Sequence, residues 1–370
     1  MKEFEYFSPT KIVFGEGKLQ EIANFLPSVN RILVVTGRHS SKANGSLDLL
    51  KTSLKEKTLL IFDEVEENPG LKTINKGANI ARREKIEIVI GLGGGSPMDA
   101  AKCIALLQTN DRLMEDYLIG AINELPLHSP LPIIEIPTTA GTGSETTQHA
   151  VITMDSHKKG YSNQGFFPKI AILDPILTLS MPREVTVNTG IDALTHSIEG
   201  HLSTLATAKS DNVAVEAIGI IKEKLPKVAQ DGENLEARSQ MLYASMLGGL
   251  VISRTRTIIL HALGYPLTTF YGMPHGRANG ALLPWALEFL SRGEHTNSPL
   301  QEKISSITEI FGDINKFINN LGISTKLSDY GITENDIPGF VGDVWGRRNL
   351  EVTPKEVKQE DIANIYRQAL

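Results

Sequence analysis

The sequence contains a single cysteine, no tract of basic residues and no long apolar run. Cys103 alone cannot form an internal disulfide, and it excludes a zinc site built from several thiolates. Acidic and basic residues are mixed along the chain and give a net charge of -6, which argues against nucleic acid and anionic membranes as partners. No apolar stretch is long enough to span a membrane, and the first residues lack the apolar segment of a secretory signal peptide. We therefore expect a protein of the reducing cytoplasm.

The first half of the chain alternates short β-branched runs with helical patterns. Each run ends in a turn signal, as buried strands do. The predicted strands are 31–37, 58–65, 86–95 and 131–139, and a helix is predicted over 70–85. Such alternation predicts βαβ crossovers and a parallel sheet that is covered by helices on both faces.

The second half is different, because helical patterns replace the β-branched runs from residue 183 onward. A chain of 370 residues exceeds one ordinary hydrophobic core, so two domains are expected. We predict an α/β domain over residues 1–182 and an all-helical domain over residues 183–370, with the boundary at the proline that ends LDPILTLSMP.

The segment IVIGLGGGSPMDAAK (88–102) has the order strand, glycine turn, helix. Glycines let backbone N–H groups approach phosphate oxygens, and the helix that follows presents its positive end, with Ser96 and Asp99 expected in its first turn. Gly91, Gly93 and Ser96 match the G-x-G-x-x-G dinucleotide fingerprint only if serine replaces the last glycine, and the loop does not follow the first strand. A tight turn without a ligand is the alternative, but three consecutive glycines favour a phosphate site.

A second loop of this type, IPTTAGTGSETT (136–147), also ends a predicted strand. Its residues Thr138, Thr139 and Thr142 carry hydroxyls that can bond a cofactor ring or ribose. Two such loops at the ends of different parallel strands favour a ligand crevice.

Asp192 and His196 lie four residues apart in GIDALTHSIEGHLS, so a helix would place them on one face, where they could bind one metal ion. Thr189 and Asp192 also fit a capping box, in which case Asp192 only closes a helix start. His196 could equally be an ordinary core histidine. Glu199 shares the face and could replace Asp192 as a ligand or orient a ligand from behind, whereas His201 faces elsewhere.

Two further histidines lie in LHALGYPLTTFYGMPHGRANG (260–280). His261 is expected at the end of an apolar helix, and His275 follows a loop broken by glycines and prolines, so the two imidazoles can converge. Three imidazoles and one carboxylate suit Fe²⁺ or Zn²⁺ and are poor ligands for Ca²⁺ or Mg²⁺. H-E-x-x-H, G-x-S-x-G and a P-loop lysine motif do not occur, so nothing supports a metalloprotease, a serine hydrolase or an NTPase.

Together the segments GLGGGSPMD, PTTAGTGSETT, GIDALTHSIEG, HALGYPL and MPHG resemble the iron-containing (group III) alcohol dehydrogenase family, over nearly the whole chain. The resemblance implies an N-terminal α/β nucleotide-binding domain with a parallel sheet and an all-helical C-terminal domain, the dehydroquinate synthase-like architecture, with the active site in the cleft. It also implies a homodimer. The metal ligands that it implies are Asp192, His196, His261 and His275.

The resemblance also implies contacts with a nicotinamide cofactor. Pyrophosphate would lie on the glycine loop, and the threonines would line the nicotinamide side. The implied residues are Asn68, Gly93, Gly94, Gly95, Ser96, Thr138, Thr139, Thr142, Met181 and Lys159, for which Lys158 is a competing match.

Two positions depart from the family pattern. NAD-preferring members often carry an aspartate at the end of the first strand, but this chain has Gly37 there, with Arg38, Ser40 and Lys42 nearby. The lost carboxylate makes room for a 2′-phosphate, so we predict NADP, with NAD as the alternative if Asp63 takes the aspartate's place.

The second departure is at Tyr265, four residues after His261, where many family members have a further histidine. This tyrosine either takes over a proton relay or packs under the nicotinamide.

We therefore predict reversible oxidation of a small alcohol to an aldehyde or ketone with NADP(H) and Fe²⁺, or Zn²⁺ as the alternative metal. A polyol (glycerol-type) dehydrogenase of the same architecture and an NADP-binding sensor without turnover are the alternatives. An anionic substrate would need several lysines or arginines in the cleft, and the basic residues expected near the proposed ligands are chiefly Arg277 and the pair Lys158 and Lys159, so a neutral substrate is favoured.

Overall fold

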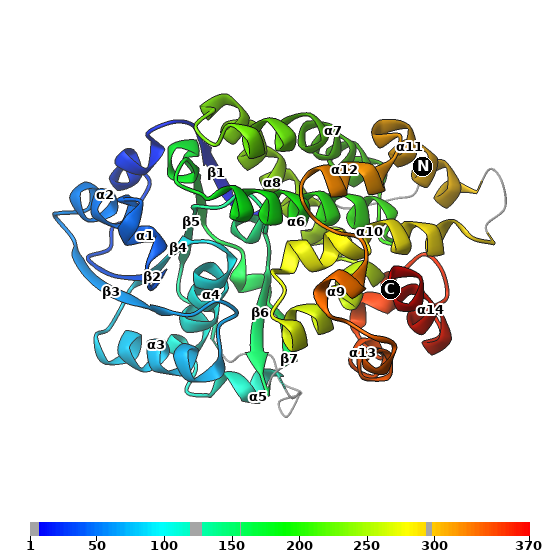
Figure 1. Cartoon of the computed structure of the whole chain (residues 1–370). Helices are drawn as coiled ribbons and strands as arrows, with labels where there is room; N and C mark the ends of the chain where they lie inside the picture. Colours follow the sequence, from blue (N-terminus) through cyan, green and yellow to red (C-terminus); the bar gives the residue numbers. More distant parts are fainter. Residues whose placement is uncertain (1–6, 119–127, 156, 294–297) are drawn as a thin grey trace. The chain divides into compact units, whose positions relative to one another are not determined.

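The computed structural model describes residues 7–118, 128–155, 157–293 and 298–370 (Figure 1). Residues 1–6, which contribute to the expectation that no signal peptide is present, lie outside these ranges. The chain forms two compact units, one ending at Met181 and the other beginning at Pro182. The first is an α/β unit and the second is built from helices, as the sequence predicts. No helix within the described ranges is long and apolar enough to cross a membrane.

The α/β unit contains a six-stranded parallel sheet. From edge to edge its strands are β1 (Lys11–Phe14), β8 (Ile170–Leu173), β5 (Ile133–Pro137), β4 (Ile88–Gly93), β2 (Arg31–Gly37) and β3 (Thr58–Val65). The prediction that 58–65 is a buried strand was wrong in one respect, because β3 lies at an edge and most of its residues are partly exposed. The carboxyl ends of β2, β4 and β5 lie side by side, and the residues that follow them form the site described below.

Helices cover both faces of this sheet, as predicted (Figure 1). Leu33 and Val35 of β2 pack with residues of α3 and α4, while Ile32 and Val34 pack on the opposite face with η1 and α2. The alternation follows from the two-residue period of a strand. The covering elements are η1 (Lys18–Asn24), α1 (Ser40–Ala43), α2 (Ser46–Ser53), α3 (Leu71–Arg83), α4 (Gly95–Thr109) and α5 (Met114–Leu118).

Residues between β5 and the end of the unit add a two-stranded antiparallel hairpin, β6 (His149–Met154) and β7 (His157–Ser162), with three 3-10 turns. These turns are η2 (Ser144–Thr146), η3 (Gln164–Phe166) and η4 (Pro175–Thr178). The turn η2 lies inside the threonine-rich loop (136–147), and the hairpin begins just after that loop, at His149.

In the helical unit, α6 packs against α7, α8 and α10 and is buried on nearly every side. A helix in this position needs partners for any polar side chain that it carries. The helices are α6 (Arg183–Leu202), α7 (Ala208–Gln230), α8 (Leu235–Thr255), α9 (Ile259–Tyr271), α10 (His275–Ser291), α11 (Pro299–Phe311), α12 (Ile314–Asn320), α13 (Ile337–Val344) and α14 (Gln359–Ala369). The described part of the unit also contains the 3-10 turns η5 (Leu327–Tyr330), η6 (Glu334–Asp336) and η7 (Arg348–Val352).

Candidate metal centre and nucleotide-binding loops

Helix α6 carries Asp192, His196 and Glu199 in its buried middle. The helix begins at Arg183, so Asp192 lies far from the first turn and the capping-box alternative was wrong. Thr189 does not cap the helix either, because its hydroxyl donates to the Val185 carbonyl at 2.9 Å. Positions i, i+4 and i+7 of a helix share one face, and α6 therefore presents an acid, an imidazole and a second acid in one row.

His261 and His275 come from the starts of two other helices. The expectation that His261 ends an apolar helix was wrong, because α8 ends at Thr255 and His261 lies in the first turn of α9. The loop before His275 is also shorter than predicted. Gly264 and Pro266 continue α9, and only residues 272–274 separate α9 from His275, the first residue of α10.

The four predicted metal ligands lie together. One ligand atom each from Asp192, His261 and His275 lies within 4.8 Å of the others. Nε2 of His261 is 3.7 Å and Nε2 of His275 is 3.9 Å from Asp192 Oδ1. The His196 ring stacks on the His261 ring with centroids 4.7 Å apart. The side chain of His275 is 24% exposed, whereas that of His261 is 3% exposed, so the group opens on the His275 side.

Glu199 lies behind His261. One carboxylate oxygen accepts the backbone N–H groups of Ile258 at 2.9 Å and of His261 at 3.2 Å, and the other contacts His261 Nδ1. A proton on Nδ1 leaves Nε2 as the nitrogen with the free lone pair. This Nε2 is buried and has no hydrogen-bond partner within the described part of the chain. Of the two roles left open by the sequence, the geometry favours Glu199 as the group that orients a ligand.

The charges of this group favour a cation at its centre. Burial alone would raise the pKa of Asp192, but His196, His261 and His275 hold it well below its usual range. Burial would lower the pKa of His261, but Glu199 and Asp192 raise it to about 9. A buried, orphaned imidazole nitrogen beside a carboxylate and a second imidazole fits the preferences of Fe²⁺ and Zn²⁺. Asp192, His196, His261 and His275 are therefore able to hold such an ion.

Asn279 belongs to the same group, although the sequence reasoning missed it. Its Nδ2 lies 3.5 Å from Asp192 Oδ1 and 3.4 Å from His275 Nε2, and its side chain is fully buried. A Cβ on Gly264 would lie 1.9 Å from Asn279 Oδ1, so only glycine leaves room for this amide. The available signal was the spacing of His275 and Asn279, four residues apart on α10.

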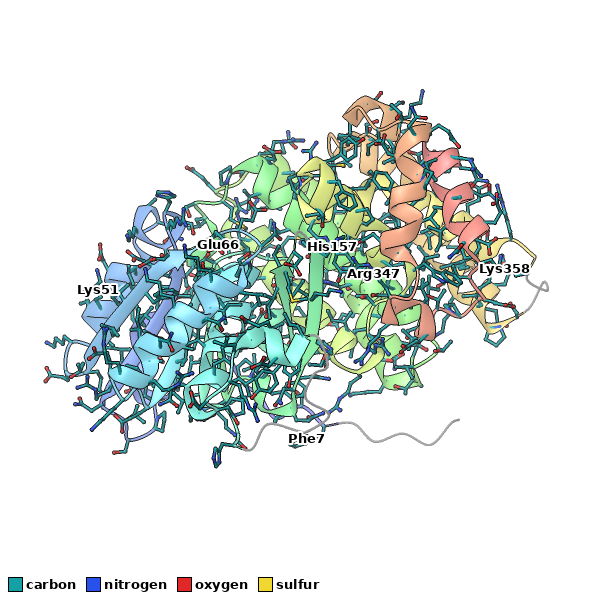
Figure 2. The ribbon with its side chains drawn as sticks, turned by 90° about the horizontal axis from the view of Figure 1, so that it is seen from below. Phe7, Lys51, Glu66, His157, Arg347 and Lys358 are labelled. Atoms are coloured by element: carbon teal, nitrogen blue, oxygen red, sulfur yellow. The ribbon has the colours of Figure 1, made fainter. Side chains whose placement is uncertain are left out.

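Tyr265 lies between His275 and a residue that the sequence did not suggest. Its ring stacks on His275 with centroids 5.4 Å apart and an angle of 8° between the planes. Arg347, labelled in Figure 2, lies over the Tyr265 ring at 4.6 Å. Asp343 fixes this arginine through an ion pair of 2.5 Å and a backbone hydrogen bond of 2.9 Å. The proposed catalytic tyrosine is thus held against a proposed metal ligand.

In the α/β unit, the glycine loop joins β4 to α4. Gly93 has a φ of +143°, and a Cβ there would lie 2.6 Å from the Pro97 side chain, so the turn requires glycine. A Cβ on Gly95 would lie 2.8 Å from Thr142, which places the two predicted loops in contact. A Cβ on Gly94 would lie 3.5 Å from the Thr139 side chain, an ordinary contact between the same two loops.

Asn68, Ser96 and Thr138 also lie at these loops. The Asn68 N–H donates to Ser96 Oγ at 3.1 Å, and the Thr138 N–H donates to the Gly93 carbonyl at 2.8 Å. Met181, the last residue of the unit, donates its N–H to the Thr178 carbonyl at 3.2 Å. The structure thus brings together most of the residues that we predict to bind the cofactor.

Asp99 differs from the expectation. Because α4 begins at Gly95, Asp99 lies past the first turn and does not act on the helix dipole there. Its carboxylate instead accepts hydrogen bonds from the Ser144 hydroxyl and from the Val151 N–H, both at 2.8 Å. Of the two competing lysines of β7, Lys158 is buried and Lys159 is exposed.

Gly37 ends β2, next to β4, and Ser40 begins the short helix α1. Lys42 forms an ion pair with Asp63, which lowers the pKa of that carboxyl. Asp63 is thus already engaged, and this weakens the alternative in which it accepts a ribose hydroxyl.

Below the loops, Glu135 of β5 is fully buried, and neither of its carboxylate oxygens has a hydrogen-bond partner among the described residues. Burial raises the pKa of Glu135 to about 8; Lys102 opposes this rise, and Asp99 and Glu145 add to it. The unfolded chain releases this proton near its ordinary pKa of 4.5. The free energy of unfolding therefore falls as the pH rises between these two values.

Glu135→Gln should remove this fall in the free energy of unfolding, because glutamine has no proton to release. The stability of the variant relative to the wild type should therefore rise from about pH 4.5 to about pH 8. The rise should reach a few kcal/mol, at about 1.4 kcal/mol per pKa unit. Urea unfolding at about pH 5 and about pH 8.5 measures the difference. A gain at the alkaline pH no larger than at the acid pH would contradict the account.

Comparisons with known proteins cover nearly the whole chain. A family model described as iron-containing alcohol dehydrogenase matches residues 9–175, and the C-terminal model of the Fe-containing alcohol dehydrogenase family matches residues 186–370. Long-chain-alcohol dehydrogenase 1 of Geobacillus thermodenitrificans is 33% identical and is matched over 98% of this chain and 97% of its own length. An NADPH-dependent butanol dehydrogenase of Clostridium saccharobutylicum is 30% identical over 97% of this chain and 96% of its own length.

A comparison with solved structures agrees with these family matches. An iron-containing alcohol dehydrogenase from Thermotoga maritima has a TM-score of 0.90 and 41% identity, with 100% of this chain and 99% of that chain covered. The parallel sheet and the helical second half are therefore shared with a crystal structure.

Proposed function

This chain belongs to the iron-containing alcohol dehydrogenase family, and from that premise we propose that it transfers a hydride between NADP(H) and a small neutral alcohol or its aldehyde or ketone. The observation that carries the proposal is the buried group of Asp192, His261 and His275, in which Glu199 leaves His261 Nε2 free to bind a metal. We propose Fe²⁺ as the ion, with Zn²⁺ as the alternative that the same donors accept.

The chain's own side chains supply the geometry. When bound, a divalent ion acts as a Lewis acid on the substrate oxygen. Glu199 keeps the proton of His261 on Nδ1, and Asn279 lies against both Asp192 and His275. Tyr265 supports the exposed side of the group through its stack on His275. Each of these contacts fixes the direction of a side-chain atom that would bind the metal, before the metal or the substrate binds.

The preference for NADP rests on Gly37. An acid at this position would repel a 2′-phosphate, and glycine removes that repulsion. Arg38 is exposed nearby, with its Nε 3.4 Å from the Glu64 carbonyl, and is the cation best placed to reach such a phosphate. Lys42 contributes less than the sequence suggested, because Asp63 already neutralises it.

A neutral substrate fits the charges around the proposed ligands. Arg347 is paired with Asp343, and Arg277 Nη2 lies 3.5 Å from Glu184. Neither leaves an uncompensated positive charge for an anionic substrate. The long-chain alcohols and butanol in the names of two relatives are also neutral.

Gly37→Asp should reverse the cofactor preference. We expect kcat/KM with NADPH, relative to NADH, to fall by roughly 10- to 100-fold. The new carboxylate repels the 2′-phosphate of NADPH and can accept a hydrogen bond from the ribose 2′-hydroxyl of NADH, and a hydrogen bond to a charged group contributes about 1.5–3 kcal/mol. Purified, iron-loaded protein is assayed with both cofactors on a panel of aldehydes from ethanal to octanal and on dihydroxyacetone.

Asp63→Asn is the matched control, since it frees Lys42 and should shift the ratio toward NADPH. A wild-type enzyme that prefers NADH would refute the NADP proposal. Turnover of dihydroxyacetone alone would indicate the polyol dehydrogenase, and binding without turnover would indicate the sensor.

A further inference from the structure

Helix α4 carries a fully buried lysine, Lys102, which has no part in the proposed chemistry. Its ammonium donates to Ser144 O and Ser144 Oγ, both at 2.7 Å, and to the His149 carbonyl at 2.9 Å. Thr147 Oγ1 lies at 3.3 Å. Lysine is almost never fully buried unless it is paired, so these contacts call for a reason beyond packing.

Among the described residues, the hydrogen-bond acceptors of Lys102 lie in one short segment. Residues 144–149 run from the last part of the threonine-rich loop into the first residue of β6. Asp99, one helical turn before Lys102, accepts hydrogen bonds from the Ser144 hydroxyl and from the Val151 N–H of β6. Two side chains of α4, an acid and a base three residues apart, thus hold the segment by which the loop leaves the sheet.

The buried ammonium is offset by its hydrogen bonds to Ser144 and His149. Glu135 Oε2 lies 3.8 Å from Lys102 Nζ and both side chains are fully buried, but with a pKa of about 8 Glu135 is mostly protonated at neutral pH and adds little countercharge. Burying an ammonium costs several kcal/mol unless hydrogen bonds and countercharges offset the loss of water. An apolar residue would fill this space without that cost, so packing alone does not explain a lysine here.

We infer that Lys102 is a positioning residue for the nicotinamide cofactor, and that it sets the threonine-rich loop (136–147) against the glycine loop. The contact between the loops is tight, because a Cβ on Gly95 would lie 2.8 Å from Thr142. When the ammonium is removed, Ser144 and His149 lose the hydrogen bonds that it donates, and the loop shifts at its exit. The inference rests on the proposed binding of NADP(H) by these two loops.

Lys102→Met keeps the length of the side chain and removes the charge. The expected result is a dissociation constant and KM for NADPH at least about tenfold higher, one lost charge-assisted contact corresponding to that factor or more. Turnover at saturating NADPH stays within about threefold. Affinity for Fe²⁺ is unchanged, because the proposed metal ligands lie in the helical unit. Lys51→Met, at an exposed lysine labelled in Figure 2, is the matched control and leaves all three quantities unchanged.

Ser144→Ala is the second variant and decides the question if Lys102→Met does not fold. It removes the hydroxyl that joins Asp99 and Lys102 and should weaken NADPH binding about threefold or more. Unchanged NADPH affinity in a folded Lys102→Met, or in Ser144→Ala if Lys102→Met is lost, overturns the inference even if the melting temperature falls. A wild-type protein that binds neither NADPH nor NADH overturns the proposed function instead.

Discussion

Asp192→Asn should abolish stoichiometric metal binding and lower turnover by roughly a thousandfold. Asp192 contributes the carboxylate in the proposed ligand set, and its Oδ1 lies 3.7 Å and 3.9 Å from the facing nitrogens of His261 and His275. Asparagine keeps the shape of the side chain but removes its negative charge. Loss of Lewis-acid stabilisation costs several kcal/mol in the transition state, and each 1.4 kcal/mol is about a factor of ten in rate.

Metal content by plasma mass spectrometry and NADPH oxidation with butanal measure both effects. Asp211→Asn is the matched control, because Asp211 also pairs with a histidine of the helical unit, His201, at 2.9 Å. This control should retain one metal per chain and nearly full turnover. An Asp192→Asn protein with a full metal equivalent and full turnover would show that the carboxylate is not a ligand.

Glu199→Gln should weaken metal affinity by about 10- to 100-fold, the range observed when a group that orients a metal-bound histidine is removed. The glutamine carbonyl can still accept the Ile258 and His261 N–H groups, so the start of α9 keeps its hydrogen bonds. Its amide donor, however, would face His261 Nδ1 and favour a proton on Nε2, the nitrogen that the metal needs.

Competition with a chromophoric chelator measures this affinity. Activity should return at excess Fe²⁺, because the ligands themselves remain. An affinity equal to that of the wild type, or an activity that excess metal does not restore, would remove Glu199 from the role assigned here.

Periodicity and turn signals predicted much of the fold. The α/β and helical halves and the parallel sheet with both faces covered were confirmed. The strands β1 and β8 were missed because each has only four residues, too few for a two-residue period to be distinct. The exposed edge of β3 depends on strand order, which no local pattern encodes.

Local patterns failed where a neighbouring helix decides the outcome. Gly264 and Pro266 have the composition of a loop, yet both lie inside α9, where Asn279 fills the space that a larger residue at 264 would occupy. Lys102 and Arg347 could not be predicted as partners of the site, because a lysine or arginine is usually solvated. Their positions follow from residues 42 and 82 positions away in the chain, Ser144 and Tyr265.

Titration of metal-free wild-type protein with Fe²⁺ under anaerobic conditions tests the central claim most directly. NADPH-dependent reduction of butanal is recorded at each step together with bound metal. Activity should rise in proportion to bound iron and reach its plateau at one ion per chain. Full activity in the metal-free protein, or a plateau unrelated to a single bound ion, would contradict the account.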